Sequence, residues 1–170
     1  MIQRLESGLF FNASAWPLDP QKPTLVFIHG SGGSKILWDN QVKGLGDVSN
    51  VIAPDLPGHG ESPGEAFATV PEYTRAVVDF IKGIDAPRPI PVGLSLGGAI
   101  VQQLLLDYPG LFSAGVLIGT GAKLKVLPII FETIEKDFSG FVGGMPKMAA
   151  SPKTDPSLLR PLLDSNLKTP

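Results

Sequence analysis

The chain has 170 residues, of which 43% are apolar and 18% are charged, and its formal net charge is −2. This balance predicts one globular domain, excludes an intrinsically disordered chain, and gives no reason to expect nucleic acid or an anionic membrane as a partner. The chain has no cysteine, which excludes disulfides, thiolate catalysis and cysteine metal sites. No apolar run approaches the ~18 residues of a membrane span, and the first residues lack the apolar core of a secretion signal, so we expect a cytoplasmic protein.

The first part of the chain alternates short apolar runs with turns and helical patterns. Residues 2–16 alternate loosely and break at a Ser-Gly pair, which predicts a β-hairpin. Residues 24–28 form a short run rich in β-formers, and glycines follow it, so this run predicts a buried parallel strand. A helix is expected within 34–45, and a further strand over 48–54.

The same alternation continues along the chain. Residues 71–84 have apolar positions at helical spacing, with a proline in the first turn. The patterns then predict a third buried strand over 89–94, a helix over 96–108 and a fourth buried strand over 114–118. Strands that alternate with helices at this spacing predict an α/β fold with a mostly parallel sheet. Such sheets bind ligands at the carboxyl ends of their strands.

The last third of the chain shows a different pattern. Apolar residues over 127–138 follow helical spacing, whereas 140–152 is rich in Gly, Pro and Met and predicts a loop. A short helix is expected to begin near residue 155, and no strand pattern returns. We therefore expect two segments, an α/β part over 1–120 and a helical, cap-like segment over 121–170.

Residues 93–97, Gly-Leu-Ser-Leu-Gly, carry the clearest chemical signal. A serine between two glycines, after a strand and before a helix, is the sequence form of a nucleophile elbow, in which a sharp turn exposes the serine hydroxyl. Gly93 and Gly97 fit this interpretation because side chains at these positions would collide across the turn. We predict that Ser95 is a catalytic nucleophile. The alternative is a glycine-rich turn with an incidental serine.

The glycine-rich segment His29–Gly33 follows the strand over 24–28. Backbone N–H groups in such a segment can approach and stabilise the negative oxygen of a tetrahedral intermediate. We predict an oxyanion hole formed by the amides of Ser31 and Leu96. A phosphate-binding loop is disfavoured because the lysine spacing of a P-loop is absent, and a plain turn stays an alternative.

A nucleophilic serine needs a base, and the chain contains two histidines. His59 lies among glycines in a turn-rich segment, with Asp55 as a conceivable partner, but a histidine in this setting more often braces its loop. His29 is also interpreted as structural. Two histidines without carboxylates at ligand spacing are a poor metal-binding set, so we expect no metal and no cofactor.

Three segments together resemble the α/β-hydrolase fold superfamily. They are 24–33, 55–62 and 93–98, and their order and spacing, with Trp38, are similar to those of small esterases, enol-lactonases and carbon–carbon bond hydrolases. The resemblance covers about residues 1–120, and 121–170 resembles the start of the helical cap of such enzymes. It implies that Ser95 is the nucleophile and that Ser31 and Leu96 supply the oxyanion hole. The residues expected to contact the substrate are Gly30, Gly32 and Trp38.

The chain departs from the family pattern after the elbow. In that family the acid and the histidine follow the serine in chain order, but no histidine follows His59 here. Asp137, Asp155 and Asp164 lie in the cap-like segment and are poor candidates for the acid. We therefore expect an N-terminal part of a longer protein, whose open sheet edge needs the rest of the fold or another chain to cover it.

Two functions follow from these observations. The first is a serine hydrolase that acts on a small ester or related acyl substrate through an acyl-enzyme. Its acid and histidine are missing from this chain, which we expect to be inactive alone. The second is a catalytically incomplete hydrolase-fold protein that binds a ligand or a protein partner.

Overall fold

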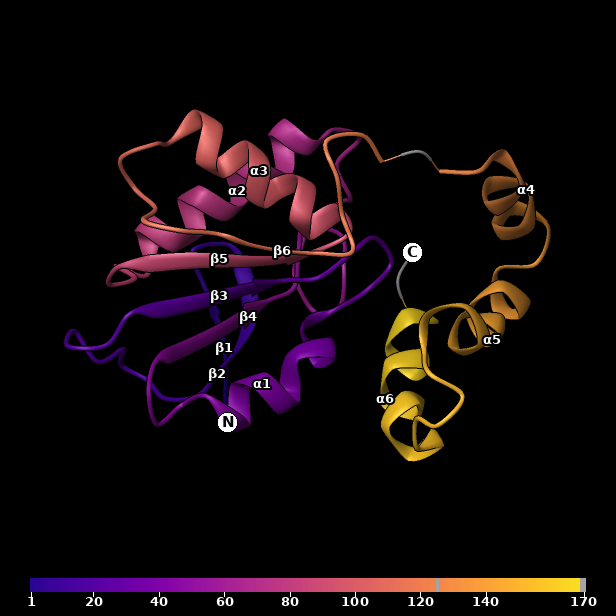
Figure 1. Cartoon of the computed structure of the whole chain (residues 1–170), viewed down its shortest axis with the longest axis horizontal. Helices are drawn as coiled ribbons and strands as arrows, with labels where there is room; N and C mark the ends of the chain where they lie inside the picture. The colour runs from indigo at the N-terminus through magenta and orange to yellow at the C-terminus, as the bar shows by residue number, and fades with distance from the viewer. Residues whose placement is uncertain (125, 169–170) are drawn as a thin grey trace.

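The computed structural model describes residues 1–124 and 126–168. It contains a six-stranded sheet with the order β1-β2-β4-β3-β5-β6 (Figure 1). The first two strands form an antiparallel hairpin, β2 also pairs antiparallel with β4, and the remaining neighbours are parallel. The predicted α/β fold with a mostly parallel sheet is therefore confirmed. The strands are β1 (Ile2–Glu6), β2 (Leu9–Ala13), β3 (Thr24–Ile28), β4 (Asn50–Pro54), β5 (Pro89–Leu94) and β6 (Val116–Ile118).

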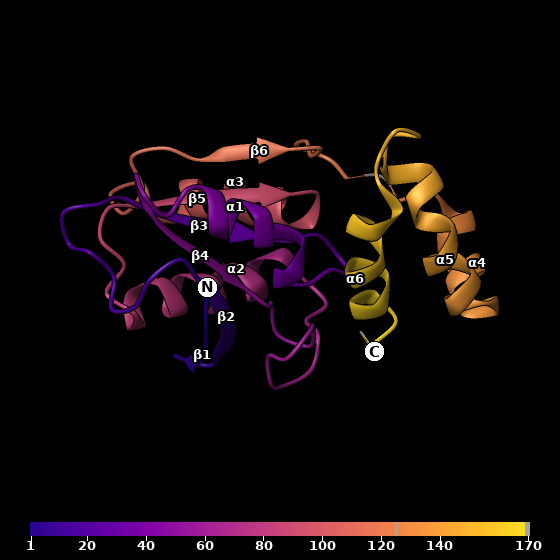
Figure 2. The ribbon, with the colours of Figure 1, turned by 90° about the horizontal axis from the view of Figure 1, so that it is seen from below.

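Helices cover both faces of the sheet, α2 (Val70–Gly83) and α3 (Leu96–Asp107) on one face and α1 (Asp39–Gly44) on the other (Figures 1 and 2). Successive strand residues point to opposite faces, so each central strand contributes to two cores. Val26 and Ile28 of β3 pack in the core that contains the apolar side of α2 and α3. Phe27 of the same strand packs in the second core, beside α1.

The helix expected within 34–45 is divided in two. A 3₁₀ turn, η1 (Lys35–Trp38), leads directly into the short helix α1. By contrast, α2 has the predicted extent and a well-defined start. Thr69 and Glu72 form a capping box, with the Thr69 N–H donating to the Glu72 carboxylate at 3.0 Å.

The strand predicted as buried over 114–118 is short and exposed. β6 covers only Val116–Ile118, and these three residues are 44%, 48% and 37% exposed. The reason is its place in the sheet, because β6 pairs with β5 on one side and forms the edge on the other. Its apolar sequence predicts a strand surrounded by the fold, whereas an edge strand has a neighbouring strand on one side only.

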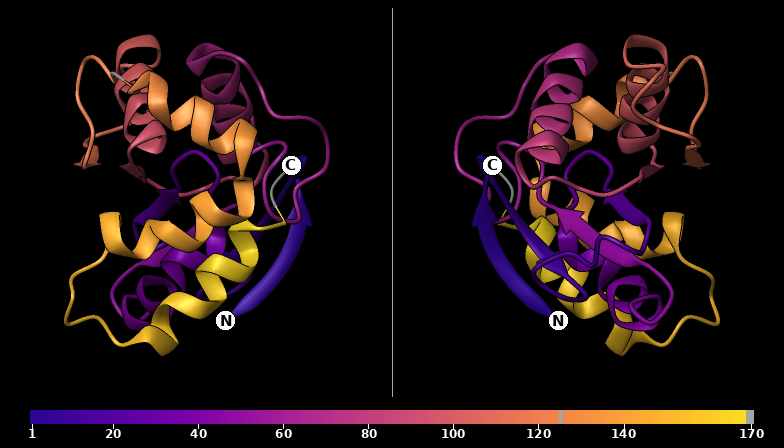
Figure 3. Two further views of the ribbon diagram at one scale, coloured as in Figure 1. Left: turned by 90° about the vertical axis from the view of Figure 1, so that its right-hand side faces the viewer. Right: turned by 90° about the vertical axis from the view of Figure 1, so that its left-hand side faces the viewer.

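The three helices α4 (Pro128–Lys136), α5 (Phe138–Ala149) and α6 (Pro156–Asn166) lie together beyond one end of the sheet (Figures 1 and 3). The prediction of a loop over 140–152 is wrong, since most of this range is helix α5 despite its glycines and Pro146. The Asp137 carboxylate caps this helix by accepting from the Gly140 N–H at 2.9 Å, and Val142 is buried. Tertiary packing and capping here outweigh weak helix propensity. Within the described ranges, no helix combines the length and apolar character needed to cross a membrane.

Candidate active site

Ser95 lies at the sharp turn between β5 and α3. Its backbone has φ +52° and ψ −114°, a conformation that non-glycine residues seldom adopt and that is concentrated at functional sites. Hydrogen bonds hold this backbone on both sides. The Ser95 N–H donates to the Ile118 carbonyl at 3.0 Å, and the Thr120 hydroxyl donates to the Ser95 carbonyl at 2.9 Å. Ser95 is an exposed residue, and it lines a cavity at this end of the sheet.

The two glycines of the elbow are needed for close backbone contact. A Cβ on Gly93 would lie 2.1 Å from the carbonyl oxygen of Gly97. A Cβ on Gly97 would lie 2.3 Å from the carbonyl oxygen of Ile28, the last residue of β3. No side chain fits at these distances, so the collisions expected from the sequence are present in the structure.

The glycine-rich segment lies directly beside the elbow. A Cβ on Gly30 would lie 3.3 Å from the Ser95 Cβ. Leu96 is the first residue of α3, so its N–H has no acceptor within the helix and lies at the positive end of the helix dipole. Among the described residues, neither the Ser31 N–H nor the Leu96 N–H has a hydrogen-bond partner. Ser31 and Leu96, which carry these two donors, line the same cavity as Ser95.

Two cavities meet at this point. The elbow cavity, of about 1140 Å³, is lined by Ser31, Ser95, Leu96 and His59 together with apolar residues of α4 and α5. The cap cavity, of about 450 Å³, lies between the glycine-rich segment and helices α5 and α6. Its walls are mainly apolar, and those from the cap-like segment include Met145, Pro146, Leu159, Leu162 and Leu163. Both cavities are lined by Ser31, Met145 and Asn166.

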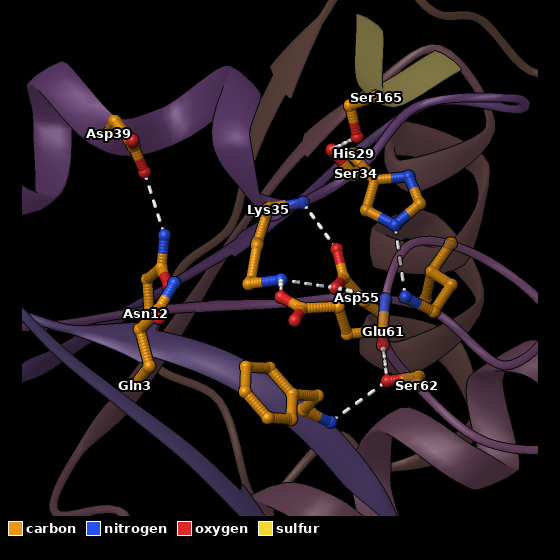
Figure 4. Close-up of polar contacts among 12 residues, drawn as sticks. Gln3, Asn12, His29, Ser34, Lys35, Asp39, Asp55, Glu61, Ser62 and Ser165 are labelled. Atoms are coloured by element: carbon orange, nitrogen blue, oxygen red, sulfur yellow. Dashed lines mark hydrogen bonds and ion pairs between the residues drawn. The ribbon is translucent and has the colours of Figure 1, made fainter. Parts of the chain in front are cut away.

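His29 is fully buried and both of its ring nitrogens are engaged. Nε2 accepts from the Leu56 N–H at 2.9 Å (Figure 4), and Nδ1 lies 2.8 Å from the Gly30 carbonyl oxygen. This pattern requires a neutral ring with its proton on Nδ1. Burial lowers the pKa of His29 to about 4 and outweighs the hydrogen bond to the Gly30 carbonyl, which acts in the opposite direction. His29 therefore braces two loops and cannot act as a base toward Ser95.

His59 is engaged in a similar way, although it lines the elbow cavity. Its Nδ1 lies 3.0 Å from the Pro57 carbonyl oxygen, and its Nε2 accepts from the Gly32 N–H at 3.3 Å. Asp55, its conceivable partner, is bound elsewhere. One carboxylate oxygen of Asp55 accepts from the Lys35 N–H at 2.6 Å, and the other lies 2.7 Å from the Lys35 Nζ. The structure therefore contradicts an Asp55–His59 catalytic pair.

Lys35 is the buried charge that sequence reasoning missed. Its Nζ contacts Asp55 and Glu61, the latter at 2.5 Å, and lies 4.7 Å from the centre of the Phe10 ring (Figure 4). Lys35 and Asp55 are almost completely withdrawn from solvent. This network attaches the loop after β4 to Lys35, the second residue after the glycine-rich segment. No sequence pattern marks it, because lysine is rarely buried and the partners are 20 and 26 residues away.

Residues 25–167 match the sequence profile of a family described as the alpha/beta hydrolase family. The chain belongs to this family. It is 31% identical over 121 residues to an esterase of Mycobacterium tuberculosis, which corresponds to 69% of this chain and 38% of that protein. Against a solved thermophilic esterase the TM-score is 0.71 at 31% identity, covering 99% of this chain and 64% of the other. Against the enol-lactonase from Burkholderia xenovorans it is 0.77 at 18% identity, covering 99% and 68%.

The matches cover only part of the length of the relatives. The chain spans about a third of the length of the first curated relatives that it matches. The TM-scores establish that its fold is that of the solved hydrolases, of which it spans about two thirds. This chain is therefore a member of the alpha/beta hydrolase family with an esterase-like fold.

Of the three residues predicted to contact the substrate of this alpha/beta hydrolase, two line a cavity and one does not. Gly30 lines the cap cavity and Gly32 lines the elbow cavity. Trp38 lines neither. It is 6% exposed and packs in the second core, with its ring centre 4.9 Å from that of Phe27. A substrate contact of Trp38 therefore has no support from its position, and we interpret it as a core residue.

The aspartates of the cap-like segment have local roles. The Asp137 and Asp155 carboxylates each accept a backbone N–H at the start of a helix, both at 2.9 Å. Asp164 pairs with Arg160 on the exposed side of α6. No cluster of three or more His, Asp or Glu side chains suited to a metal ion occurs in the described part of the chain.

Proposed function

We propose that Ser95 is the nucleophile of an ester hydrolase. The observation that carries this proposal is the strained, exposed serine at a strand-to-helix turn, which lines the elbow cavity together with Ser31 and Leu96, two residues whose backbone N–H groups have no partner among the described residues. This arrangement suits acyl transfer, in which a hydroxyl attacks a carbonyl carbon and nearby donors stabilise the resulting oxyanion. Membership of the alpha/beta hydrolase family supports the same reaction class.

In the proposed reaction the Ser95 Oγ forms a bond to the carbonyl carbon, and its proton passes to a general base. The amides of Ser31 and Leu96 donate to the carbonyl oxygen as it becomes negative. The bond to the alcohol oxygen then breaks and the alcohol leaves with a proton. Water attacks the acyl-enzyme in the second half of the reaction, which releases the acid and restores the serine.

The base does not come from the two histidines of this chain. Both ring nitrogens of His29 and of His59 are held by backbone groups. We therefore propose that the base and its acidic partner are supplied from outside these 170 residues, and that the chain alone is inactive.

The cavities indicate the type of substrate. A carbonyl group beside Ser31 and Ser95 can extend one arm into the cap cavity, whose walls are mostly leucine, methionine, proline and alanine. The other arm enters the larger elbow cavity, which has both polar and apolar walls. An ester with one small or medium apolar arm fits this arrangement best, because apolar walls contribute binding free energy in proportion to the apolar area they cover.

Labelling with a fluorophosphonate probe tests the nucleophile. The probe is applied to this chain and to the product of the complete reading frame, each with a Ser95→Ala variant. Ser139→Ala serves as the matched control, since Ser139 is exposed on α5. We expect labelling of the complete product that Ser95→Ala abolishes and Ser139→Ala leaves unchanged, with little labelling of the chain alone. Equal labelling of the Ser95→Ala variant would contradict the proposal.

The engaged histidines also favour a second candidate, a hydrolase-fold protein that binds a ligand without turnover. The same experiment separates the two. A reading frame that ends after Pro170, together with no labelling of Ser95, supports the binding function. An extended frame that encodes a later Asp and His, together with labelling, supports the hydrolase.

A further inference from the structure

A buried hydrogen bond joins helix α6 to the residue that follows the glycine-rich segment. The hydroxyls of Ser34 and Ser165 lie 2.7 Å apart (Figure 4). The two residues are 2% and 9% exposed. They are 131 positions apart in sequence, so this contact exists only when the cap-like segment is seated against the sheet end. Because both hydroxyls are withdrawn from water, separating them leaves two polar groups unpaired.

Asn166, the last residue of α6, makes a second contact with the same segment. Its side-chain amide fits with the nitrogen toward two carbonyl oxygens, donating to Gly32 and to Leu162, each at 3.1 Å. On its other side, Gly32 donates its N–H to the Nε2 of His59 at 3.3 Å. Gly32 is therefore held by the core through its N–H and by α6 through its carbonyl.

A third contact fixes the far end of this stretch and belongs to the core alone. The Lys35 N–H donates to the Asp55 carboxylate at 2.6 Å, and both residues are buried. Movement of the cap-like helices would leave this contact in place. Among the described residues, the side chains of α6 that hydrogen bond to the stretch from Gly30 to Ser34 are those of Ser165 and Asn166.

The cap cavity lies between the same two partners. Gly30, Ser31 and Gly33 line one side of it, and Leu159, Leu162 and Leu163 of α6 line another. A group bound in this cavity would contact the glycine-rich segment and α6 at the same time. Asn166 lines both cavities, so it lies where they meet.

We propose that Ser165 and Asn166 are positioning residues: their hydrogen bonds from helix α6 hold the glycine-rich segment in place. Through them, seating of an apolar group between the segment and α6 orients the Ser31 N–H toward the substrate carbonyl. This inference rests on the proposed function, because it takes the Ser31 N–H as an oxyanion donor. Catalytic competence would then depend on the cap-like segment being in place.

Amide hydrogen exchange on this chain tests the structural part of the proposal without requiring activity. Ser165→Ala removes the buried hydroxyl. Asn166→Asp keeps the shape of the side chain but removes the donated hydrogen bonds. We expect the hydrogen-bonded amides of Gly32 and Gly33 to exchange about fivefold to tenfold faster in each variant, the effect of losing one hydrogen bond, with β3 and β4 unchanged. Ser165→Thr, which keeps the hydroxyl, restores the wild-type rate, and Ser139→Ala is the neutral control.

Unchanged exchange at Gly32 and Gly33 in both variants overturns the proposal. A rise of equal size in β3 and β4 also overturns it, because it indicates a general loss of stability. Hydrolysis of p-nitrophenyl acetate by the product of the complete reading frame tests the functional part. We expect Ser165→Ala and Asn166→Asp to lower kcat about tenfold and to change KM by less than about twofold. An unchanged kcat contradicts the positioning role. Failure of the wild type to hydrolyse any ester contradicts the proposed function instead, while hydrogen exchange still shows whether α6 holds the segment.

Discussion

At the scale of single residues, Lys35 is held by ion pairs with Asp55 and Glu61, the first of which is buried on both sides. Its ammonium group lies 2.7 Å from Asp55 and 2.5 Å from Glu61, and almost none of the Lys35 and Asp55 side chains is exposed. Removing one partner of a buried ion pair leaves the other charge uncompensated, which costs more than the pair contributes when intact. The network therefore makes the structure intolerant of change at Lys35, although it does not by itself make the protein unusually stable.

Lys35→Met tests this constraint. The variant keeps most of the side-chain volume but leaves the Asp55 carboxylate unpaired, so we expect the free energy of unfolding to fall by about 3–5 kcal/mol. Urea denaturation followed by circular dichroism measures the change. Arg160→Ala, which removes the exposed pair with Asp164, is the control and should cost less than about 1 kcal/mol. An equal loss of unfolding free energy in the two variants would show that the buried network stabilises the fold no more than the exposed pair does.

His29 makes stability depend on pH. Its pKa of about 4 in the folded chain lies below its ordinary value of 6.5, so the unfolded chain binds the proton more tightly. Its contribution to the free energy of unfolding is therefore complete above pH 6.5 and is lost as pH falls toward 4. From pH 7 to pH 5 the loss amounts to about 2 kcal/mol. Urea midpoints at these two pH values measure it, and His29→Gln should show a smaller difference. An identical difference in the variant would contradict this role.

At the scale of secondary-structure elements, the strand-to-helix turn is fixed by how closely β3, β5 and α3 approach one another. A Cβ on Gly97 would lie 2.3 Å from a backbone oxygen of β3, which cannot move as a flexible side chain would. We expect Gly97→Ala to destabilise the fold by about 3 kcal/mol and to displace the turn that presents Ser95. Thermal unfolding measures this cost. Gly44→Ala, at the end of α1 with no atom within 4 Å of the added Cβ, should change stability by less than about 1 kcal/mol. A Gly97→Ala variant as stable as Gly44→Ala would refute the close contact.

The elements differ in how well local sequence predicts them. Helix α2 has apolar spacing, a proline in its first turn and a capping box, all of which agree, and its bounds are close to the prediction. Helix α5 has three glycines and a proline, so its local sequence indicates a loop. It is helical because Asp137 caps it and because Val142 is buried, and these effects depend on neighbours that a local pattern does not include.

At the scale of the whole molecule, β6 leaves an apolar edge on the sheet. Val116, Leu117 and Ile118 are all more than a third exposed, and among the described residues no strand pairs with the second side of β6. Exposed apolar edges promote pairing with other chains. We expect this chain to associate as its concentration rises, and Leu117→Lys to reduce that association severalfold. Sedimentation velocity measures it, with Val48→Lys as the control because Val48 is 72% exposed but lies outside the strands. Equal association of wild type and Leu117→Lys would contradict the prediction.

The sequence by itself determined the parallel core of the sheet and the identity of the elbow. Strand runs and glycines act over a few residues, so Ser95, Gly93 and Gly97 could be recognised from their neighbours alone. It also determined that the chain contains two histidines as candidates for a histidine base. Only the tertiary structure decided that both are held by backbone groups, that Asp55 binds Lys35, that Trp38 is buried in the core, and that α6 contacts the glycine-rich segment. Each of these depends on contacts between residues far apart in the chain, where burial and hydrogen-bond geometry, which no local pattern encodes, set the outcome.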